Sequence, residues 1–199
     1  MLKTKTLLLF LLKATIIYAL FSAPLTFYDA AYGRMYRNVA GMFFGKFRET
    51  GFVKFREGKD PATTHINIGN NLLIRPDGSA DTAATDVNTR YLGYLPAILF
   101  LALVLASPVT WRRRLIALAA GMVLVTFLVM FKQWIFLLWQ CQQYPWLKLT
   151  DFSGTSLKLL TFANNFISVT SSSVLYFVVA IWLLVTFRVD DFRTEKVKK

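Results

Sequence analysis

The sequence predicts a mainly α-helical membrane protein with four transmembrane helices and a small antiparallel β-containing periplasmic domain. Hydrophobic residues make up 55% of the 199 residues and charged residues only 17%, whereas a soluble domain is usually about a quarter charged. Most apolar residues lie in four long runs, and about 20 such residues let a helix cross a hydrocarbon layer about 30 Å thick. One long polar segment separates the first two runs.

The first apolar run and its cytoplasmic flank cover residues 1–27. Lys13 interrupts this run, and Pro24 directly follows the small residues Ser22 and Ala23. A secretory signal peptide has an uninterrupted apolar core and a small-residue cleavage site, and proline just after such a site is unfavourable. We therefore expect a retained transmembrane anchor rather than a cleaved signal peptide.

The periplasmic region, residues 28–90, begins with an aromatic-rich stretch. Tyr28, Tyr32 and Tyr36 recur every four residues, so they fall on one face of a helix. Such an amphipathic helix can rest on the outer membrane surface or pack on a small core of the region itself. The sequence leaves both alternatives open.

The second part of this region is expected to form strands. Residues 53–56 and 65–68 alternate between apolar and polar, and Pro76-Asp77-Gly78 is a turn signal. These patterns predict a small antiparallel unit of three or four short strands. A unit of this size needs support from the membrane helices or from a partner.

The rest of the chain continues the alternation of spans and loops. The expected segments are a second transmembrane helix at 91–109, a basic cytoplasmic turn at 110–114, a third transmembrane helix at 115–139, a periplasmic loop with a short interfacial helix at 140–165, a fourth transmembrane helix at 166–187, and a basic cytoplasmic tail at 188–199.

Basic residues gather in the N-terminal flank, the 110–114 turn and the tail. Cytoplasmic loops are enriched in Lys and Arg, so we expect a multi-pass protein with both termini cytoplasmic. The net charge of +12 is then mainly a topology signal, and we expect no nucleic acid as a partner. Arg112, Arg113 and Arg114 are additionally expected to hold anionic lipid.

Several polar residues interrupt the spans, and we interpret them as helix–helix or partner contacts. Small, hydroxylated and amide side chains let membrane helices approach and bond across their contact. A proton or ion pathway is not predicted, because no Asp or Glu lies within any span. The candidate contact residues are Lys13, Lys132, Gln133, Gln140, Ser171 and Ser172.

Catalytic chemistry has three candidate residues, Cys141 as nucleophile, His65 as base and Arg90 as a cation for an oxyanion. They come from unconnected parts of the sequence, so a packed cysteine and an exposed strand histidine are the favoured interpretations. The chain contains no phosphate-binding glycine loop, HExxH, GxSxG or CxxC motif. We therefore expect no cofactor and no metal site.

The stretch from Asp86 to Pro96, with the following apolar helix, Leu105-Ala-Ser-Pro108 and Arg112-Arg-Arg114, resembles small polytopic inner-membrane proteins associated with bacterial exosortase loci. The resemblance covers about residues 86–114. It implies an accessory protein of the bacterial inner membrane in an envelope or secretion pathway. Exosortases themselves place Cys, Arg and His on membrane helices near the outer face, and the chain departs from that pattern because His65 lies in a loop.

These observations favour a non-catalytic accessory or scaffold subunit of a bacterial inner-membrane envelope or secretion complex. Its expected partners are membrane lipids and other integral membrane protein subunits. The alternative is a membrane enzyme or transporter that acts on a lipid-linked or peptide substrate at the periplasmic face.

Overall fold

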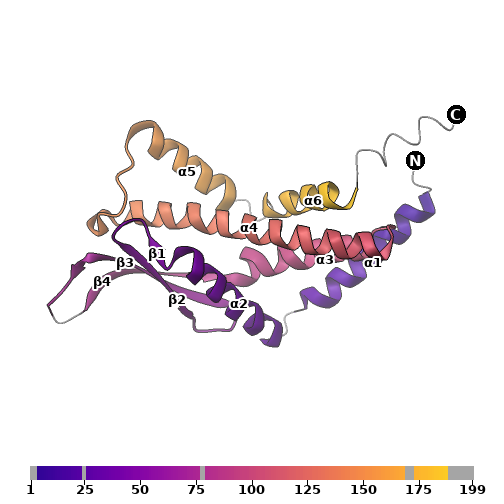
Figure 1. The fold of residues 1–199 in the computed structure, drawn as a ribbon, viewed down its shortest axis with the longest axis horizontal. Coiled ribbons are helices and arrows are strands. Elements are labelled where there is room, and N and C mark those ends of the chain that lie inside the picture. The colour runs from indigo at the N-terminus through magenta and orange to yellow at the C-terminus, as the bar shows by residue number, and fades with distance from the viewer. Residues whose placement is uncertain (1–3, 24–25, 77–78, 169–172, 188–199) are drawn as a thin grey trace. The chain divides into compact units, whose positions relative to one another are not determined.

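The computed structural model describes residues 4–23, 26–76, 79–168 and 173–187, and it is mainly helical with one small antiparallel sheet (Figure 1). The elements are α1 (Thr4–Ser22), α2 (Thr26–Phe44), β1 (Lys46–Phe47), β2 (Gly51–Glu57), β3 (Thr63–Ile74), β4 (Ala80–Asn88), the π-helical turn η1 (Arg90–Tyr94), α3 (Leu95–Ala106), α4 (Trp111–Gln143), the 3₁₀ turn η2 (Pro145–Leu147), α5 (Gly154–Ser168) and α6 (Ser173–Thr186).

The chain forms two compact units. The helical unit contains the described residues 4–23, 95–128 and 173–187, which are α1, α3, the first part of α4 and α6. The sheet unit contains the described residues 26–76, 79–94 and 129–168. It holds the sheet, α2, α5 and the second part of α4.

The helical unit has a core made by side chains of α3, α4 and α6, including Phe100, Val125 and Val178. Gly121 of α4 lies against the ring of Phe100, and a Cβ atom at Gly121 would be 1.9 Å from the nearest ring carbon. A glycine is therefore required where these two helices approach each other.

Ser107, fully buried just after α3, joins three parts of the helical unit through hydrogen bonds. The indole Nε1 of Trp182 donates to Ser107 Oγ at 2.9 Å, and Arg114 Nη2 donates to the Ser107 carbonyl at 2.8 Å. Arg114 thus satisfies a backbone carbonyl beyond the end of α3, where the helix itself supplies no donor.

The sheet has the strand order β1-β2-β3-β4, with antiparallel neighbours throughout. Val53, Ile68 and Ala83 lie opposite one another on adjacent strands, so they share one face of the sheet, and all three are buried. On the other face, the ring of Phe52 covers its cross-strand neighbour Gly69, where a Cβ would be 2.3 Å from a ring carbon.

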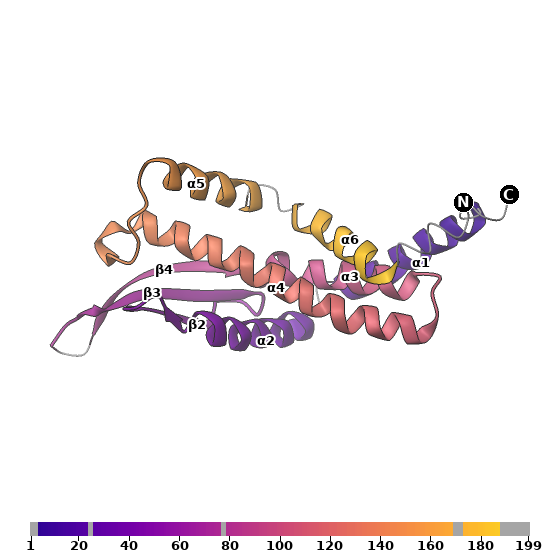
Figure 2. The same ribbon diagram turned by 45° about the horizontal axis from the view of Figure 1, so that its top comes forward.

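Helix α2 packs on the buried face of the sheet within the sheet unit (Figure 2). Its residues Gly33, Tyr36, Ala40 and Phe44 recur every three or four residues and are buried, and the rings of Tyr36 and Phe44 contact Phe55 of β2. The structure therefore shows this stripe packed on a core that the sheet shares with α4. The opposite face exposes Phe27, Met35 and Met42, and contact of that face with a membrane surface stays a prediction.

The structure confirms a mainly helical chain with a small antiparallel sheet. By length and composition, α1 and α4 are the two described helices long and apolar enough to cross a membrane, and the apolar helices at Arg90–Ala106 and Val174–Thr186 are shorter. Four transmembrane helices are therefore not confirmed. The expected short helix in 140–165 is α5, and the expected fourth span falls on the end of α5, on residues outside the described chain, and on α6.

Candidate functional site

The most notable polar contact in the sheet unit joins two helices that are far apart in the sequence. The Tyr36 hydroxyl of α2 donates a hydrogen bond to Gln133 Oε1 of α4 at 2.7 Å. Gln133 is directed into the core because Met130 and Leu137, three residues before and four residues after it, lie on the same buried face of α4. Burial, reinforced by neighbouring Tyr32, raises the pKa of Tyr36.

Gln133 keeps one group unpaired. Its side chain is 0% exposed, and among the described residues no acceptor bonds its Nε2. An unpaired buried donor costs about 1–3 kcal/mol, so this amide is expected to find an acceptor in water or in a ligand.

Gln133 is one of the residues around a cavity of about 240 Å³, although its buried amide has no surface open to it. Lys132, Gln133 and Phe136 of α4 form one wall. The end of β4 forms the other, through Asp86, Val87 and Asn88. Within the described chain, the side chain of Lys132 forms no ion pair and no hydrogen bond. We call this cavity the β4–α4 groove.

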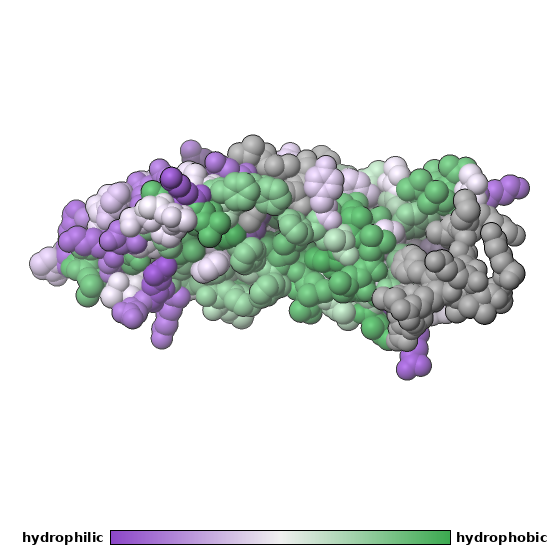
Figure 3. Space-filling model, turned by 90° about the horizontal axis from the view of Figure 1, so that it is seen from above, coloured by the Kyte–Doolittle hydropathy of each residue, from purple (hydrophilic) through white to green (hydrophobic). Residues whose placement is uncertain are grey.

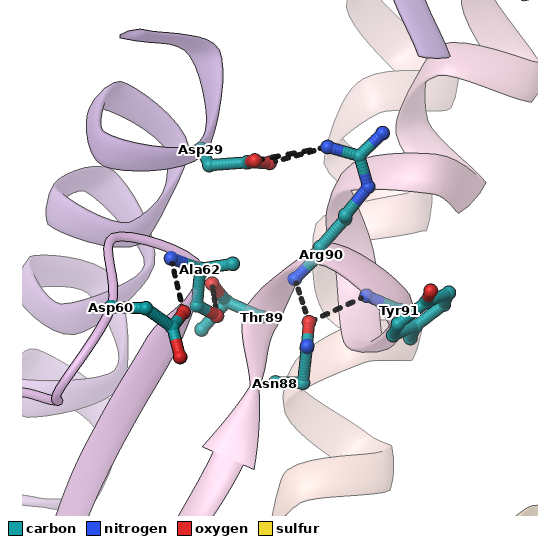
Figure 4. Close-up of polar contacts among 7 residues, drawn as sticks. All are labelled: Asp29, Asp60, Ala62, Asn88, Thr89, Arg90 and Tyr91. Carbon is teal, nitrogen blue, oxygen red and sulfur yellow. Dashed lines mark hydrogen bonds and ion pairs between the residues drawn. The ribbon is translucent and has the colours of Figure 1, made fainter. Parts of the chain in front are cut away.

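The end of β4 is held by a compact set of hydrogen bonds (Figure 4). Asn88 Oδ1 accepts from the backbone N–H groups of Arg90 at 3.0 Å and Tyr91 at 3.4 Å. The Thr89 hydroxyl donates to the Ala62 carbonyl at 2.8 Å. Asn88 therefore satisfies the first free amides of the turn that follows, as side chains do at helix starts, and it fixes the point where the strand ends.

An ion pair holds the same region from the side of α2. One guanidinium nitrogen of Arg90, Nη1, lies 3.0 and 2.9 Å from the two carboxylate oxygens of Asp29 (Figure 4). Both side chains are nearly buried, at 12% and 11% exposed. Removing one partner would leave the other charge buried and unpaired, which makes this pair a structural requirement.

The three candidate catalytic residues have separate partners. Arg90 is bound by Asp29, and His65 donates from Nδ1 to Asp86 at 2.6 Å. Cys141 lies in the hydrophobic core together with Ile66, and side chains alternate along a strand, so His65 points to the opposite face of the sheet from that core. The structure does not bring Cys141 and His65 together as a nucleophile and base.

The residues expected to make contacts lie in different settings. Lys132 lines the β4–α4 groove, Gln133 is buried beside it, and Gln140 is half-buried in α4. Lys13 is exposed on α1. Ser171 and Ser172 lie outside the described residues. Of the three arginines expected to hold lipid, Arg112 is exposed, Arg113 is half-buried, and Arg114 donates to Ser107 within the chain.

A second cavity, of about 500 Å³, lies in the sheet unit beside the loop after α4. Its wall includes Arg48 and Lys148, whose backbones both have positive φ, at 56° and 50°, a conformation uncommon for residues other than glycine. Thr150 also lines it, and its buried Oγ1 has no partner among the described residues.

Sequence reasoning did not identify Tyr36 as the partner of Gln133, or Asp86 and Asn88 as lining residues. Tyr36 and Gln133 are 97 residues apart, and no local pattern connects them. No protein-family model matches the chain, and no match was found among curated proteins or solved structures.

Proposed function

We propose that the protein is a non-catalytic accessory subunit that anchors or stabilises a larger complex in the bacterial inner membrane. In this proposal the helical unit lies in the bilayer, with four helices crossing it and both termini cytoplasmic. The sheet unit is the periplasmic part, and membrane lipids and other integral membrane subunits are the partners.

The surface of the helical unit supports the membrane placement. Its outward side chains are large and apolar; for example, Leu20, Val123 and Leu184 are 66%, 69% and 75% exposed. Figure 3 shows green, hydrophobic surface gathered over these helices, while purple, hydrophilic surface gathers over the sheet unit. Exposed apolar surface of this extent is typical of contact with lipid or with a partner protein.

The lengths of α1 and α4 are consistent with this placement, whereas the 12 residues of α3 extend only about 18 Å, so its crossing would use neighbouring residues. The 19 residues of α1 extend about 28 Å and the 33 residues of α4 about 50 Å at 1.5 Å per residue. The hydrocarbon layer is about 30 Å thick, so α4 is long enough to cross it and still supply its last residues to the core of the sheet unit. The 14 described residues of α6 extend about 21 Å, so its crossing would use neighbouring residues as well.

The position of Lys13 in α1 supports a role as a subunit of a larger complex. It is the middle residue of α1, about 14 Å from either end of that helix, and it is exposed among exposed leucines. A charged side chain at the centre of a bilayer is costly, and snorkelling relieves the cost mainly near helix ends. The described helices of the helical unit contain no Asp or Glu, so an acidic residue on a helix of another subunit would be the matching partner.

The test is extraction of the tagged full-length protein from its native membrane in digitonin. We expect a larger particle of fixed stoichiometry, and we expect Lys13→Ala to release the protein from it. Lys5→Ala, at the cytoplasmic start of the same helix, is the matched control and should leave the particle intact. A clean wild-type monomer, or a Lys13→Ala particle identical to wild type, would contradict the proposal.

The proposed topology has its own measurement. Reporters fused at the two termini should both show a cytoplasmic location, and an alkaline wash should leave the protein in the membrane fraction. Termini in different compartments would remove the assignment of the sheet unit to the periplasm.

A further inference from the structure

The two edges of the sheet differ in how they are protected. Edge strands present unpaired backbone groups, and proteins usually protect them with short strands, lysine or proline. The edge strand β1 has two residues, one of them Lys46. The edge strand β4 has nine residues, Ala80–Asn88, without Lys, Arg or Pro; its two charged residues, Asp81 and Asp86, are paired with Arg75 and His65, and in the described chain no strand pairs with its outer side.

Hydrogen bonds beside the sheet fix which groups of β4 face outward. Gly58 N–H donates to Thr63 O, and Asn71 N–H donates to Thr50 O, so odd-numbered residues of β3 direct their backbone groups to the β2 side. Even-numbered residues of β3 therefore face β4, in agreement with the bond from Thr89 N–H to Ala62 O.

The register transfers this alternation to β4. Thr64, Ile66 and Ile68 of β3 pair with Val87, Thr85 and Ala83, so those β4 residues direct their backbone groups inward. The residues between them direct theirs to the free edge. These outward residues are Thr82, Ala84, Asp86 and Asn88.

The β4–α4 groove lies at the C-terminal end of this free edge. Asp86, Val87 and Asn88, the last residues of β4, line it together with Tyr91 and Leu92, which follow the strand. The backbone groups of Asp86 and Asn88 face outward, so the groove adjoins the last outward-facing groups of the edge. In Figure 2, β4 is the strand nearest to the C-terminal part of α4, which supplies the opposite wall.

The groove is small and contains one cation without a partner. Its volume of about 240 Å³ is below the range of about 300–1,000 Å³ usual for whole small-molecule ligands, so it suits one side chain or a chain terminus. The Lys132 ammonium has no carboxylate partner in the described chain, and the one carboxylate on the groove wall, Asp86, is bound to His65. A cation without a carboxylate partner matches a carboxylate of a ligand.

We propose that β4 binds an extended polypeptide segment of a partner protein as a fifth strand, and that the β4–α4 groove receives a carboxylate of that segment. Main-chain hydrogen bonds to the outward groups of β4 supply affinity, and the groove supplies specificity, as in other cases of strand addition. The carboxylate comes from an acidic side chain or from the C-terminus of the segment. This site lies in the sheet unit and does not depend on the proposed role of Lys13.

The test uses the full-length protein in dodecyl maltoside micelles and a fluorescein-labelled peptide, Thr-Val-Thr-Val-Thr-Val-Glu, with a free C-terminus. We expect saturable binding by fluorescence anisotropy. Ala84→Pro should weaken binding about ten-fold or more, because it removes an outward N–H while leaving the bonds to β3 in place. Ala84→Val keeps that N–H and is the matched control, which should bind as wild type does.

Two further arms identify the carboxylate. Lys132→Met should weaken binding about ten-fold, whereas Lys54→Met, on an exposed position of β2, should not. A peptide amidated at its C-terminus and a peptide with Gln in place of Glu distinguish the terminal from the side-chain carboxylate. Binding that survives removal of both carboxylates would overturn the assignment of the groove.

Hydrogen exchange on the wild-type protein makes the result independent of whether Ala84→Pro folds. Bound peptide should slow exchange of the Thr82 and Ala84 amides, which face the free edge. Absence of saturable binding at millimolar peptide, or binding without protection of these two amides, would overturn strand addition at β4.

Discussion

The core of the sheet unit and the helix α1 of the helical unit differ in how far their apolar side chains are buried. In the sheet unit, Tyr36 and Ile66 are 1% and 0% exposed, and the opposite face of the sheet carries polar residues. In the helical unit, α1 has a single buried residue, Ala14, and its leucines point outward. The sheet unit has a continuous apolar core, although α2 and α5 also expose apolar side chains such as Met42 and Phe162, whereas α1 of the helical unit exposes nearly its whole apolar surface.

The comparison predicts that single side chains inside the sheet unit carry more stability than single side chains on the outside of α1. We expect the largest loss of stability from a change inside the sheet unit. Each is measured on the full-length protein in micelles.

The largest effect is expected at the ion pair of the sheet unit. Arg90→Met should lower the free energy of unfolding of this unit by about 3–5 kcal/mol, because it leaves the Asp29 carboxylate buried without a cation. Hydrogen exchange of the Ile66 and Ile68 amides measures the change. Arg75→Met is the matched control, because its pair with Asp81 is exposed and exposed pairs contribute about 0–1 kcal/mol.

The double variant Asp29→Leu, Arg90→Met isolates the cause. It removes both charges, so it should recover most of the stability lost in Arg90→Met. If the double variant is as unstable as the single one, the loss comes from packing of the Arg90 side chain rather than from an unpaired carboxylate.

The next effect concerns the helical unit. Gly121→Ala should destabilise the packing of α3 on α4 by about 1–3 kcal/mol, because the new methyl group would overlap the buried ring of Phe100. Faster hydrogen exchange in residues 100–104 of α3 measures it. Unchanged exchange in these residues would contradict the close approach of the two helices.

At alkaline pH the stability of the sheet unit should depend on the buried tyrosines of α2 and on Cys141, because burial raises the pKa of the Cys141 thiol to about 11. Burial raises the pKa of Tyr32 and of Tyr36 in the folded protein, whereas a tyrosine in the unfolded chain ionises near pH 10. Below pH 10 both tyrosines are protonated in the folded and in the unfolded protein, so they give the free energy of unfolding no pH dependence there. Above pH 10 the unfolded state releases protons first, and each tyrosine should lower stability by about 1.4 kcal/mol per pH unit.

The variant Tyr36→Phe separates the contribution of Tyr36 to this pH dependence from those of Tyr32 and Cys141. It should remove about a third of the loss of stability between pH 10 and pH 11, as measured by urea unfolding at each pH, because Tyr32 and Cys141 still contribute. At neutral pH it should cost about 1–3 kcal/mol, because Gln133 loses its remaining hydrogen bond. An unchanged alkaline slope would mean that Tyr36 ionises without unfolding.

Local sequence patterns predicted the features that depend on neighbouring residues. The four-residue spacing of the tyrosines placed α2, and alternation in residues 53–56 and 65–68 placed parts of β2 and β3. Strand β4 had no such signal, because its residues are small or polar and Ala83 is its single buried residue. Its position is set by pairing with β3.

Tertiary contacts decided the features that sequence analysis did not predict. The apolar run of α4 is continuous, so nothing in it marks the point where side chains change from the helical unit to the core of the sheet unit. Gln133 was identified as a contact residue from its polarity within an apolar run, but its partner Tyr36 lies in a different segment. The β4–α4 groove depends on the same long-range packing, which no residue spacing encodes.

The smallest effect is expected at Gly41, a helical glycine whose surroundings differ from those of Gly121. A Cβ placed at Gly121 in the helical unit would overlap the ring of Phe100, whereas nothing lies within 4 Å of a Cβ placed at Gly41 of α2 in the sheet unit. Gly41→Ala should therefore stabilise α2 by about 0.4–1 kcal/mol, since alanine has less backbone entropy to lose than glycine. Slower hydrogen exchange within α2 measures the gain. The same substitution would then stabilise one unit and destabilise the other, and a loss of stability at Gly41 would instead indicate that a neighbouring molecule contacts this face of α2.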